Sequence, residues 1–119
     1  MPDSPQDVHK KVLGRKGEKL ALQYLKKQGC KLLKTNYRTP FGEADIVVQD
    51  GDETVFVEVK TRTGDSFGAP REAVGSVKQQ RYYKIAECYC LASKEEPNAR
   101  FDVIEVYADG KIEHFKNVF

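Results

Sequence analysis

Long apolar segments are absent from this sequence of 119 residues, and cysteine is scarce. No stretch reaches the length that spans a membrane, and residues 1–11 lack the apolar core of a secretory signal. The three cysteines, Cys30, Cys88 and Cys90, follow no metal-ligand spacing and are typical of a reduced, intracellular protein. We therefore expect a cytoplasmic protein with no membrane partner.

Net charge is also small, because 20 Lys and Arg residues are offset by 18 Asp and Glu residues. The formal charge of +2 does not by itself indicate a nucleic-acid partner. The basic residues are nevertheless grouped, and locally basic surface attracts phosphate even when the total charge is near zero. Composition alone favours the simpler alternative of a solvated surface of mixed charge. The groups lie at 9–19, at 26–34 and at Lys78, Arg81 and Lys84.

Several motifs of common enzyme classes are missing as well. The sequence has no Walker loop, no nucleophile elbow and no zinc spacing, and it has no internal repeat. His9 and His114 are isolated, and we expect both at the surface. At this length one compact domain is the default, so we expect a flexible tail over 1–11 and a single domain over 12–119.

Hydrophobic periodicity predicts two helices and five strands. Apolar residues at helical spacing predict a helix over about 12–28 and a second helix, broken near Gly75, over 70–93. Ser76 and Gln79 fit a capping box that would restart this second helix. The order α-β-β-β-α-β-β indicates an α/β or α+β sandwich around one sheet. Alternation and turn residues place the strands at 31–38, 43–49, 54–62, 100–107 and 112–118.

The strand over 54–62 carries charge where burial is expected. Its valines point to one face, whereas Glu58 and Lys60 point to the other. A strand so rich in valine should be largely buried, and burying a carboxylate with an amine is costly unless the two are well matched. The commonest use of such a pair is to hold a divalent metal beside a phosphate.

The Asp-Gly turn at 50–53 predicts which residues of two strands face each other. If the turn is centred on its middle residues, Asp45 lies opposite Glu58, and Glu43 lies opposite Lys60. Opposed Cβ atoms lie about 5 Å apart, so the two acids would repel each other unless positive charge lies between them. Mg²⁺ takes hard oxygen ligands and would supply that charge. Lys60 would then be placed to stabilise a phosphate or to orient water.

The same residues allow an ordinary structural interpretation. Glu43 and Lys60 could form a cross-strand ion pair, Asp45 could cap a turn, and Glu58 could face solvent. A turn of odd length would also shift the register by one residue and separate the acids. Geometry alone leaves both interpretations open.

Resemblance to a known family adds to the argument. Asp45 followed by Glu58-Val59-Lys60 on the next strand resembles the D…(D/E)xK signature of the PD-(D/E)xK, or restriction-endonuclease-like, nucleases. Longer segments resemble the bacterial YraN-like family, which is assigned to this nuclease fold by similarity, and they cover nearly the whole chain after the first dozen residues. These segments lie at 14–18, 36–38, 42–45, 56–62, 67–68 and 100–103.

The resemblance implies a restriction-endonuclease-like fold, with a mixed central sheet flanked by helices, and a role for each matching residue. Asp45 and Glu58 match the principal ligands of Mg²⁺ or Mn²⁺, and the Val59 carbonyl would complete the coordination. Lys60 matches the catalytic lysine. Glu18 matches an acid that supports the metal site from the helix before the sheet, so the implied catalytic set is Glu18, Asp45, Glu58 and Lys60.

Candidate contacts to nucleic acid come from the basic groups and the second helix. Gln79 with Tyr83 resembles the Q-x-x-x-Y element of RecB-type nucleases, and a packed Tyr with a surface Gln is the alternative. Basic side chains near tyrosines or after the active strand are candidate phosphate contacts. The complete set of candidates is Arg15, Arg62, Lys78, Gln79 and Arg81.

We therefore expect a metal-dependent nuclease domain that hydrolyses phosphodiesters with Mg²⁺ or Mn²⁺ as cofactor. The expected partner is nucleic acid, DNA in preference to RNA, and branched or recombination intermediates are candidate substrates. A homodimer would suit symmetric cutting. Two alternatives stay open: a nucleic-acid-binding module of the same fold that does not cleave, and a protein-interaction domain with a vestigial site.

Overall fold

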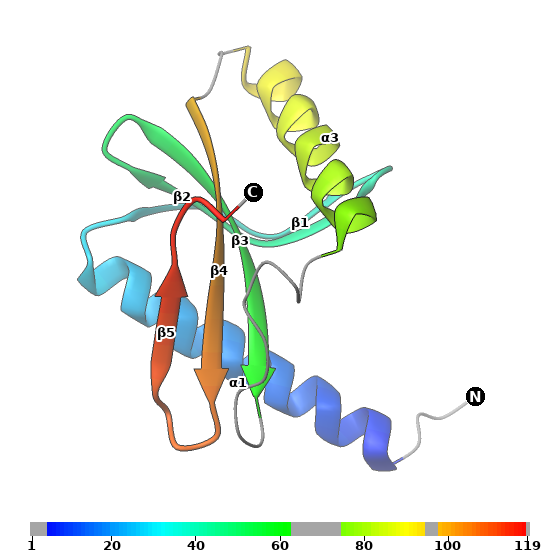
Figure 1. Ribbon diagram of the computed structural model, residues 1–119, viewed down its shortest axis with the longest axis vertical. Helices are drawn as coiled ribbons and strands as arrows, with labels where there is room; N and C mark the ends of the chain where they lie inside the picture. Colours follow the sequence, from blue (N-terminus) through cyan, green and yellow to red (C-terminus); the bar gives the residue numbers. More distant parts are fainter. Residues whose placement is uncertain (1–4, 63–74, 95–97, 119) are drawn as a thin grey trace.

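The computed structural model describes residues 5–62, 75–94 and 98–118, with side chains from residue 14 onward. Helices and strands follow in the predicted order, which confirms the α+β class. No helix in these ranges is both long enough and apolar enough to cross a membrane. The elements are α1 (Pro5–Lys27), β1 (Lys31–Thr39), β2 (Gly42–Asp50), β3 (Glu53–Arg62), α3 (Ser76–Ser93), β4 (Asn98–Tyr107) and β5 (Ile112–Phe115) (Figure 1).

The strands form one mixed sheet in the order β1-β2-β3-β4-β5. Neighbouring strands are antiparallel except for β3 and β4, which run parallel. Parallel neighbours need a long crossover connection, and α3 lies in the connection from β3 to β4. The predicted mixed central sheet is therefore confirmed.

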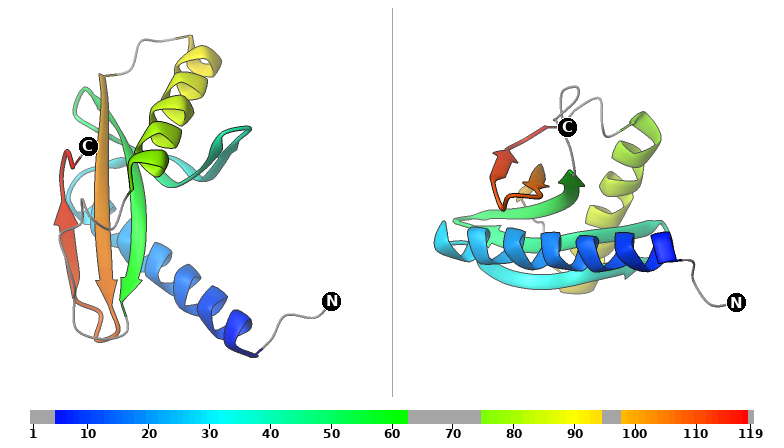
Figure 2. Two further views of the ribbon diagram at one scale, coloured as in Figure 1. Left: turned by 45° about the vertical axis from the view of Figure 1, so that its right-hand side comes forward. Right: turned by 90° about the horizontal axis from the view of Figure 1, so that it is seen from below.

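The two helices cover opposite faces of the sheet (Figure 2). Alternation along the strands gives each face its own apolar set, so two separate clusters form the core. One cluster joins α1 to the sheet through Ala21, Leu25, Ile46, Val48, Val55, Val57, Ile104 and Val106. The other joins α3 to the sheet through Ala44, Val47, Phe56, Tyr82, Ile85, Ala86 and Phe101.

Two element ends and one helix cap differ from the prediction. Helix α1 begins at Pro5 rather than near residue 12, and proline is favoured in the first turn of a helix because its missing N–H has no partner there. Strand β5 ends at Phe115 rather than at residue 118, because Asn117 adopts a left-handed backbone with φ 55°. The predicted capping box is wrong: Gly75 is the N-cap of α3 and no side chain caps the helix. Residues 70–74, which we expected to be helical, lie outside the described residues.

The predicted register of the β2–β3 hairpin is confirmed. Five residue pairs follow it, from Asp50↔Glu53 at the turn to Ile46↔Val57. Beyond Ile46 the paired ladder of the two strands ends. The expected pairs Asp45–Glu58 and Glu43–Lys60 therefore lie beyond the ladder. On its other side, Glu43 pairs with Arg38 of β1, and their side chains form a salt bridge of 3.4 Å.

A close approach fixes α1 against the far end of β3. Gly17 of α1 is buried, and a Cβ atom at this position would collide with the Thr61 hydroxyl. Because only glycine allows this contact, the helix lies close to the sheet at this point. Glu18 follows Gly17 directly and is thereby held near the strands that carry the predicted site.

Candidate active site

Asp45 lies where β2 and β3 separate. It directly precedes Ile46, the last residue of the paired ladder. Its carboxylate oxygen Oδ2 accepts a hydrogen bond of 2.8 Å from the backbone N–H of Val59. The Asp45 side chain on β2 thus accepts a hydrogen bond from a backbone N–H of β3, as a backbone carbonyl would do in a regular ladder. This bond holds Asp45 beside Glu58 on the neighbouring strand.

Glu58 is 6% exposed and is held from two sides. From α3, the Lys78 ammonium donates a hydrogen bond to Oε1 and the Tyr82 hydroxyl donates one to Oε2. These two residues are four apart, so they lie on one face of the helix. From the same strand, Lys60 Nζ lies 3.6 Å from Oε1. Both oxygens of the buried carboxylate are therefore matched by donors.

The acids of the site act on one another. Burial first, and the negative charge of Glu58 second, raise the pKa of Asp45 to about 7, although the Val59 hydrogen bond opposes this. Burial also raises the pKa of Glu18, helped by the charges of Glu43 and Glu58. The structure therefore brings Glu18, Asp45 and Glu58 into one electrostatic group, with Lys60 beside Glu58.

A hollow of about 290 Å³ lies beside Asp45, between α1, β1 and β2; Arg15, Glu18 and Asn36 line it together with Asp45. An adjoining hollow of about 560 Å³ shares Arg15, Glu18 and Asn36 and adds Arg38. Arg15 was among the predicted phosphate contacts. Asn36 and Arg38 were not, although they belong to a segment that carried the family resemblance.

Arg62 continues the row of polar side chains on the β3 face that carries Glu58 and Lys60. Its guanidinium Nη2 lies 3.4 Å from Oε1 of Glu105, which is 1% exposed. The other oxygen of Glu105 accepts a hydrogen bond of 2.8 Å from the Tyr107 hydroxyl. Arg62 is thus held in a fixed direction by β4.

Two residues of α3 contact Glu58. Lys78 was among the predicted phosphate contacts, and Tyr82 lies outside the predicted set. Tyr83 is 45% exposed, and its ring forms a T-shaped contact with Phe101, with the ring centroids 5.1 Å apart. Arg81 is exposed. The K-x-x-x-Y spacing at 78–82 equals that of Q-x-x-x-Y at 79–83, so spacing alone cannot distinguish the two pairs.

The carboxylate oxygens at the site are ligands of the kind that a hard divalent cation prefers. Within the described residues, no group of three or more His, Cys, Asp and Glu side chains is arranged to hold a metal ion. Asp45 and Glu58 nevertheless interact electrostatically, and the Val59 N–H, next to Glu58 on β3, holds Asp45 in place. Mg²⁺ is often bound by one or two carboxylates and completed by water and substrate phosphate.

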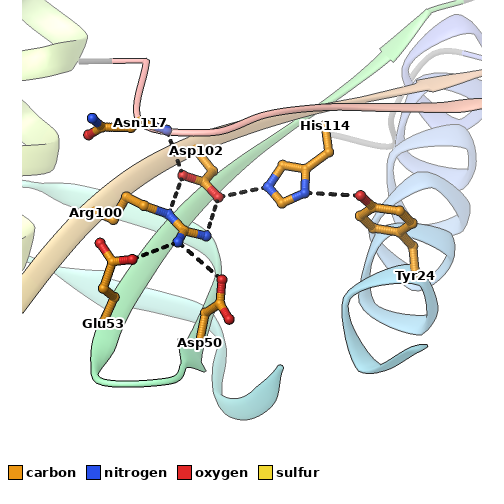
Figure 3. Close-up of polar contacts among 7 residues, drawn as sticks. All are labelled: Tyr24, Asp50, Glu53, Arg100, Asp102, His114 and Asn117. Carbon is orange, nitrogen blue, oxygen red and sulfur yellow. Dashed lines mark hydrogen bonds and ion pairs between the residues drawn. The ribbon is translucent and has the colours of Figure 1, made fainter. Parts of the chain in front are cut away.

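A second polar cluster lies around Asp102, which is fully buried (Figure 3). Asp102 accepts two hydrogen bonds of 3.0 Å from Arg100 and one of 3.0 Å from the Asn117 N–H. His114 Nε2 lies 2.7 Å from Asp102, and His114 Nδ1 lies 3.1 Å from the Tyr24 hydroxyl. The expectation that His114 is a surface residue is wrong, since its side chain is 6% exposed.

The same cluster reaches the hairpin turn. Arg100 Nη1 lies 3.1 Å from a carboxylate oxygen of Asp50 and 3.0 Å from one of Glu53. Helix α1, the β2–β3 turn, β4 and the segment after β5 are thereby joined through one buried guanidinium and one buried carboxylate. Arg100 and Asp102 make their hydrogen bonds and ion pairs within the protein, which indicates that this cluster has a structural role. It is separate from the acids around Asp45.

Comparison with known proteins places the chain among bacterial relatives. The model of the family described as uncharacterised protein family UPF0102 matches residues 17–106. A UPF0102 protein of Thermodesulfovibrio yellowstonii is 50% identical over 107 residues, which are 90% of this chain and 95% of the relative. A UPF0102 protein of Caldanaerobacter subterraneus is 44% identical over 119 residues, with 94% and 98% coverage. One from Geobacter metallireducens is 45% identical over 116 residues, with 94% and 95% coverage.

Proposed function

Because the chain belongs to the uncharacterised protein family UPF0102, the YraN-like family that the sequence resembles, we propose its activity from the site itself. We propose a metal-dependent nuclease-like domain that hydrolyses nucleic-acid phosphodiesters. The observation that carries the proposal is that Asp45, anchored to the Val59 N–H where β2 and β3 separate, interacts electrostatically with Glu58. Burial and the Glu58 charge raise the pKa of Asp45 to about 7, so a second negative charge beside Glu58 is unfavourable without a counterion. A hard divalent cation would neutralise this charge.

Each residue of the site has a proposed role. Asp45, Glu58 and the Val59 carbonyl would hold Mg²⁺ or Mn²⁺, and Glu18 would support the site from α1. A bound divalent cation polarises a phosphoryl oxygen and lowers the pKa of a coordinated water molecule. Lys60, whose ammonium lies 3.6 Å from Glu58, would orient the attacking water or stabilise the developing phosphate charge.

The surroundings of the acids support a phosphate-bearing substrate. Arg15, Asn36 and Arg38 line the hollows beside Asp45, and Arg62 extends the row on β3. Arg side chains suit phosphate because their donors match two oxygens at once. We propose DNA rather than RNA as the substrate, with branched or recombination intermediates as the first candidates and a homodimer as the form that would cut both strands.

A calorimetric titration with Mn²⁺ tests the proposal. We expect binding to the wild type and its loss in the Asp45→Ala/Glu58→Ala variant, because both carboxylates would be ligands. Asp52→Ala, which removes an exposed acid from the hairpin turn, is the matched control and should bind like the wild type. Branched, single-stranded and duplex DNA are then tested for Mn²⁺-dependent cleavage. Cleavage that survives Glu58→Ala would contradict the assignment.

One observation favours a second function, a nucleic-acid-binding module that does not cleave. Lys78 and Tyr82 already engage both oxygens of Glu58, so the acid is neutralised from within the protein. Such a module would bind DNA in a salt-dependent way through its basic side chains. Its binding would survive chelation by EDTA and the Lys60→Ala change, whereas a nuclease would lose its cleavage under both conditions.

A further inference from the structure

Positive charge near the two acids comes from the protein itself. Lys78 lies near the beginning of α3, and its ammonium donates a hydrogen bond to Glu58 Oε1. The charge of Lys78 also acts on Asp45, where it opposes the rise in pKa. A tethered cation therefore interacts with both of the carboxylates that would bind a metal ion.

Tyr82, the other partner of Glu58 on α3, cannot easily leave. It is 1% exposed, and within the core its ring forms a T-shaped contact with Phe101, with the ring centroids 6.4 Å apart. Moving it would open a cavity, which is costly in a close-packed interior. Tyr82 therefore keeps Oε2 of Glu58 occupied and holds the carboxylate in place.

Lys78 can move. Its side chain is 38% exposed, compared with 26% for Lys60 and 7% for Glu58, and a long flexible stem carries its ammonium. Water can solvate the ammonium if it leaves Oε1, so its release does not strand a buried charge. Of the donors on Glu58, Lys78 is the one that an incoming cation can displace at low cost.

We propose that Lys78 is an internal competitor of the metal ion: its ammonium occupies the Glu58 oxygen that a divalent cation needs, and metal binding displaces it. This inference rests on the proposed function. Lys78 would hold the site neutral in the metal-free protein and would set the metal concentration at which the site fills. It would be a positioning residue for Glu58 and not a ligand.

Calorimetric titration with Mn²⁺ at pH 8 tests the competition. Lys78→Met keeps the length of the side chain and removes the charge, and we expect it to lower the Kd for Mn²⁺ about tenfold or more, as for the loss of one charge-assisted hydrogen bond. Lys84→Met is the matched control, because Lys84 lies on the same helix with its ammonium 4.9 Å from the Phe41 ring. It should leave the Kd unchanged. Lys78→Gln repeats the test, and circular dichroism checks that each variant is folded.

The outcomes separate the competition from the metal site itself. Tighter binding in Lys78→Met, or binding that appears only in this variant, supports the competition. Binding in the wild type that is lost in Asp45→Ala/Glu58→Ala but unchanged or weakened in Lys78→Met overturns the competition and leaves the metal site standing. Absence of binding in both the wild type and Lys78→Met overturns both.

Discussion

Replacing Asp102 by Asn should destabilise the fold more than any comparable change of a surface acid. The carboxylate is fully buried and accepts hydrogen bonds from Arg100, His114 and the Asn117 N–H. Asn keeps the shape but removes the charge, and its NH₂ group cannot accept a hydrogen bond. Breaking a buried ion pair on one side costs about 3–5 kcal/mol, because the remaining charge is left uncompensated. Asp50 and Glu53 still face Arg100, so we expect a loss of about 3 kcal/mol.

Urea unfolding followed by circular dichroism measures this loss. A typical domain is stable by about 5–15 kcal/mol, so Asp102→Asn should remain folded in water with a clearly lower midpoint. Asp109→Asn is the control: Asp109 is exposed and accepts one bond of 2.9 Å from the Lys111 N–H, so its replacement should cost less than about 1 kcal/mol. If the two variants lost similar stability, the Arg100 cluster would not hold the fold together as its geometry indicates.

Two further predictions concern pH and close packing. Burial would raise the pKa of Asp102, but bonds from His114, Arg100 and the Asn117 N–H outweigh it and hold that pKa below the usual value. This contribution is present above about pH 4 and lost as pH falls through the folded-state pKa. The stability difference between wild type and Asp102→Asn should therefore shrink below about pH 4 in acid titrations followed by urea unfolding; a constant difference down to pH 2 would contradict this. Gly17→Ala should cost about 1 kcal/mol because its Cβ meets the Thr61 hydroxyl, whereas in a Thr61→Ala background it should be neutral or stabilising. Equal costs in both backgrounds, measured by thermal unfolding, would refute the close contact.

The hairpin shows which part of the site a sequence can predict. A two-residue turn leaves little freedom in strand pairing, so the Asp-Gly signal correctly predicted five residue pairs, up to Ile46↔Val57 next to Asp45 and Glu58. The same rule does not say where the ladder ends, and both Asp45 and Glu43 lie beyond its end. It assumes that paired strands stay paired, whereas β2 leaves β3 after Ile46 and its end follows β1. Where two strands separate depends on the packing of the whole sheet, which the pairing rule does not contain.

Helix α3 shows a different limit. Tyr82 and Tyr83 are adjacent, so this helix contains two pairs in which a tyrosine follows a polar residue by four positions. The two pairs point in different directions around the helix axis. The apolar residues that meet the sheet decide which pair faces it, and Ile85 and Ala86 are buried with Tyr82. Val77 and Leu91 are apolar and lie on the same helix, yet they are 64% and 81% exposed. Periodicity was too weak here to show that Tyr82, rather than Tyr83, contacts Glu58.

The contacts that sequence reasoning could not supply are those between charged residues far apart in the chain. The sheet brings Arg100 to Asp50, and the packing of α3 on the sheet brings Lys78 to Glu58. The pairing of Asp45 with Glu58 implied that positive charge must lie nearby, and a metal ion was one source of it. Lys78 is another, and the two cannot occupy the same Glu58 oxygen. The affinity of the site for a divalent cation should therefore depend on α3 as much as on the two acids themselves, and this dependence is what the Lys78→Met titration measures.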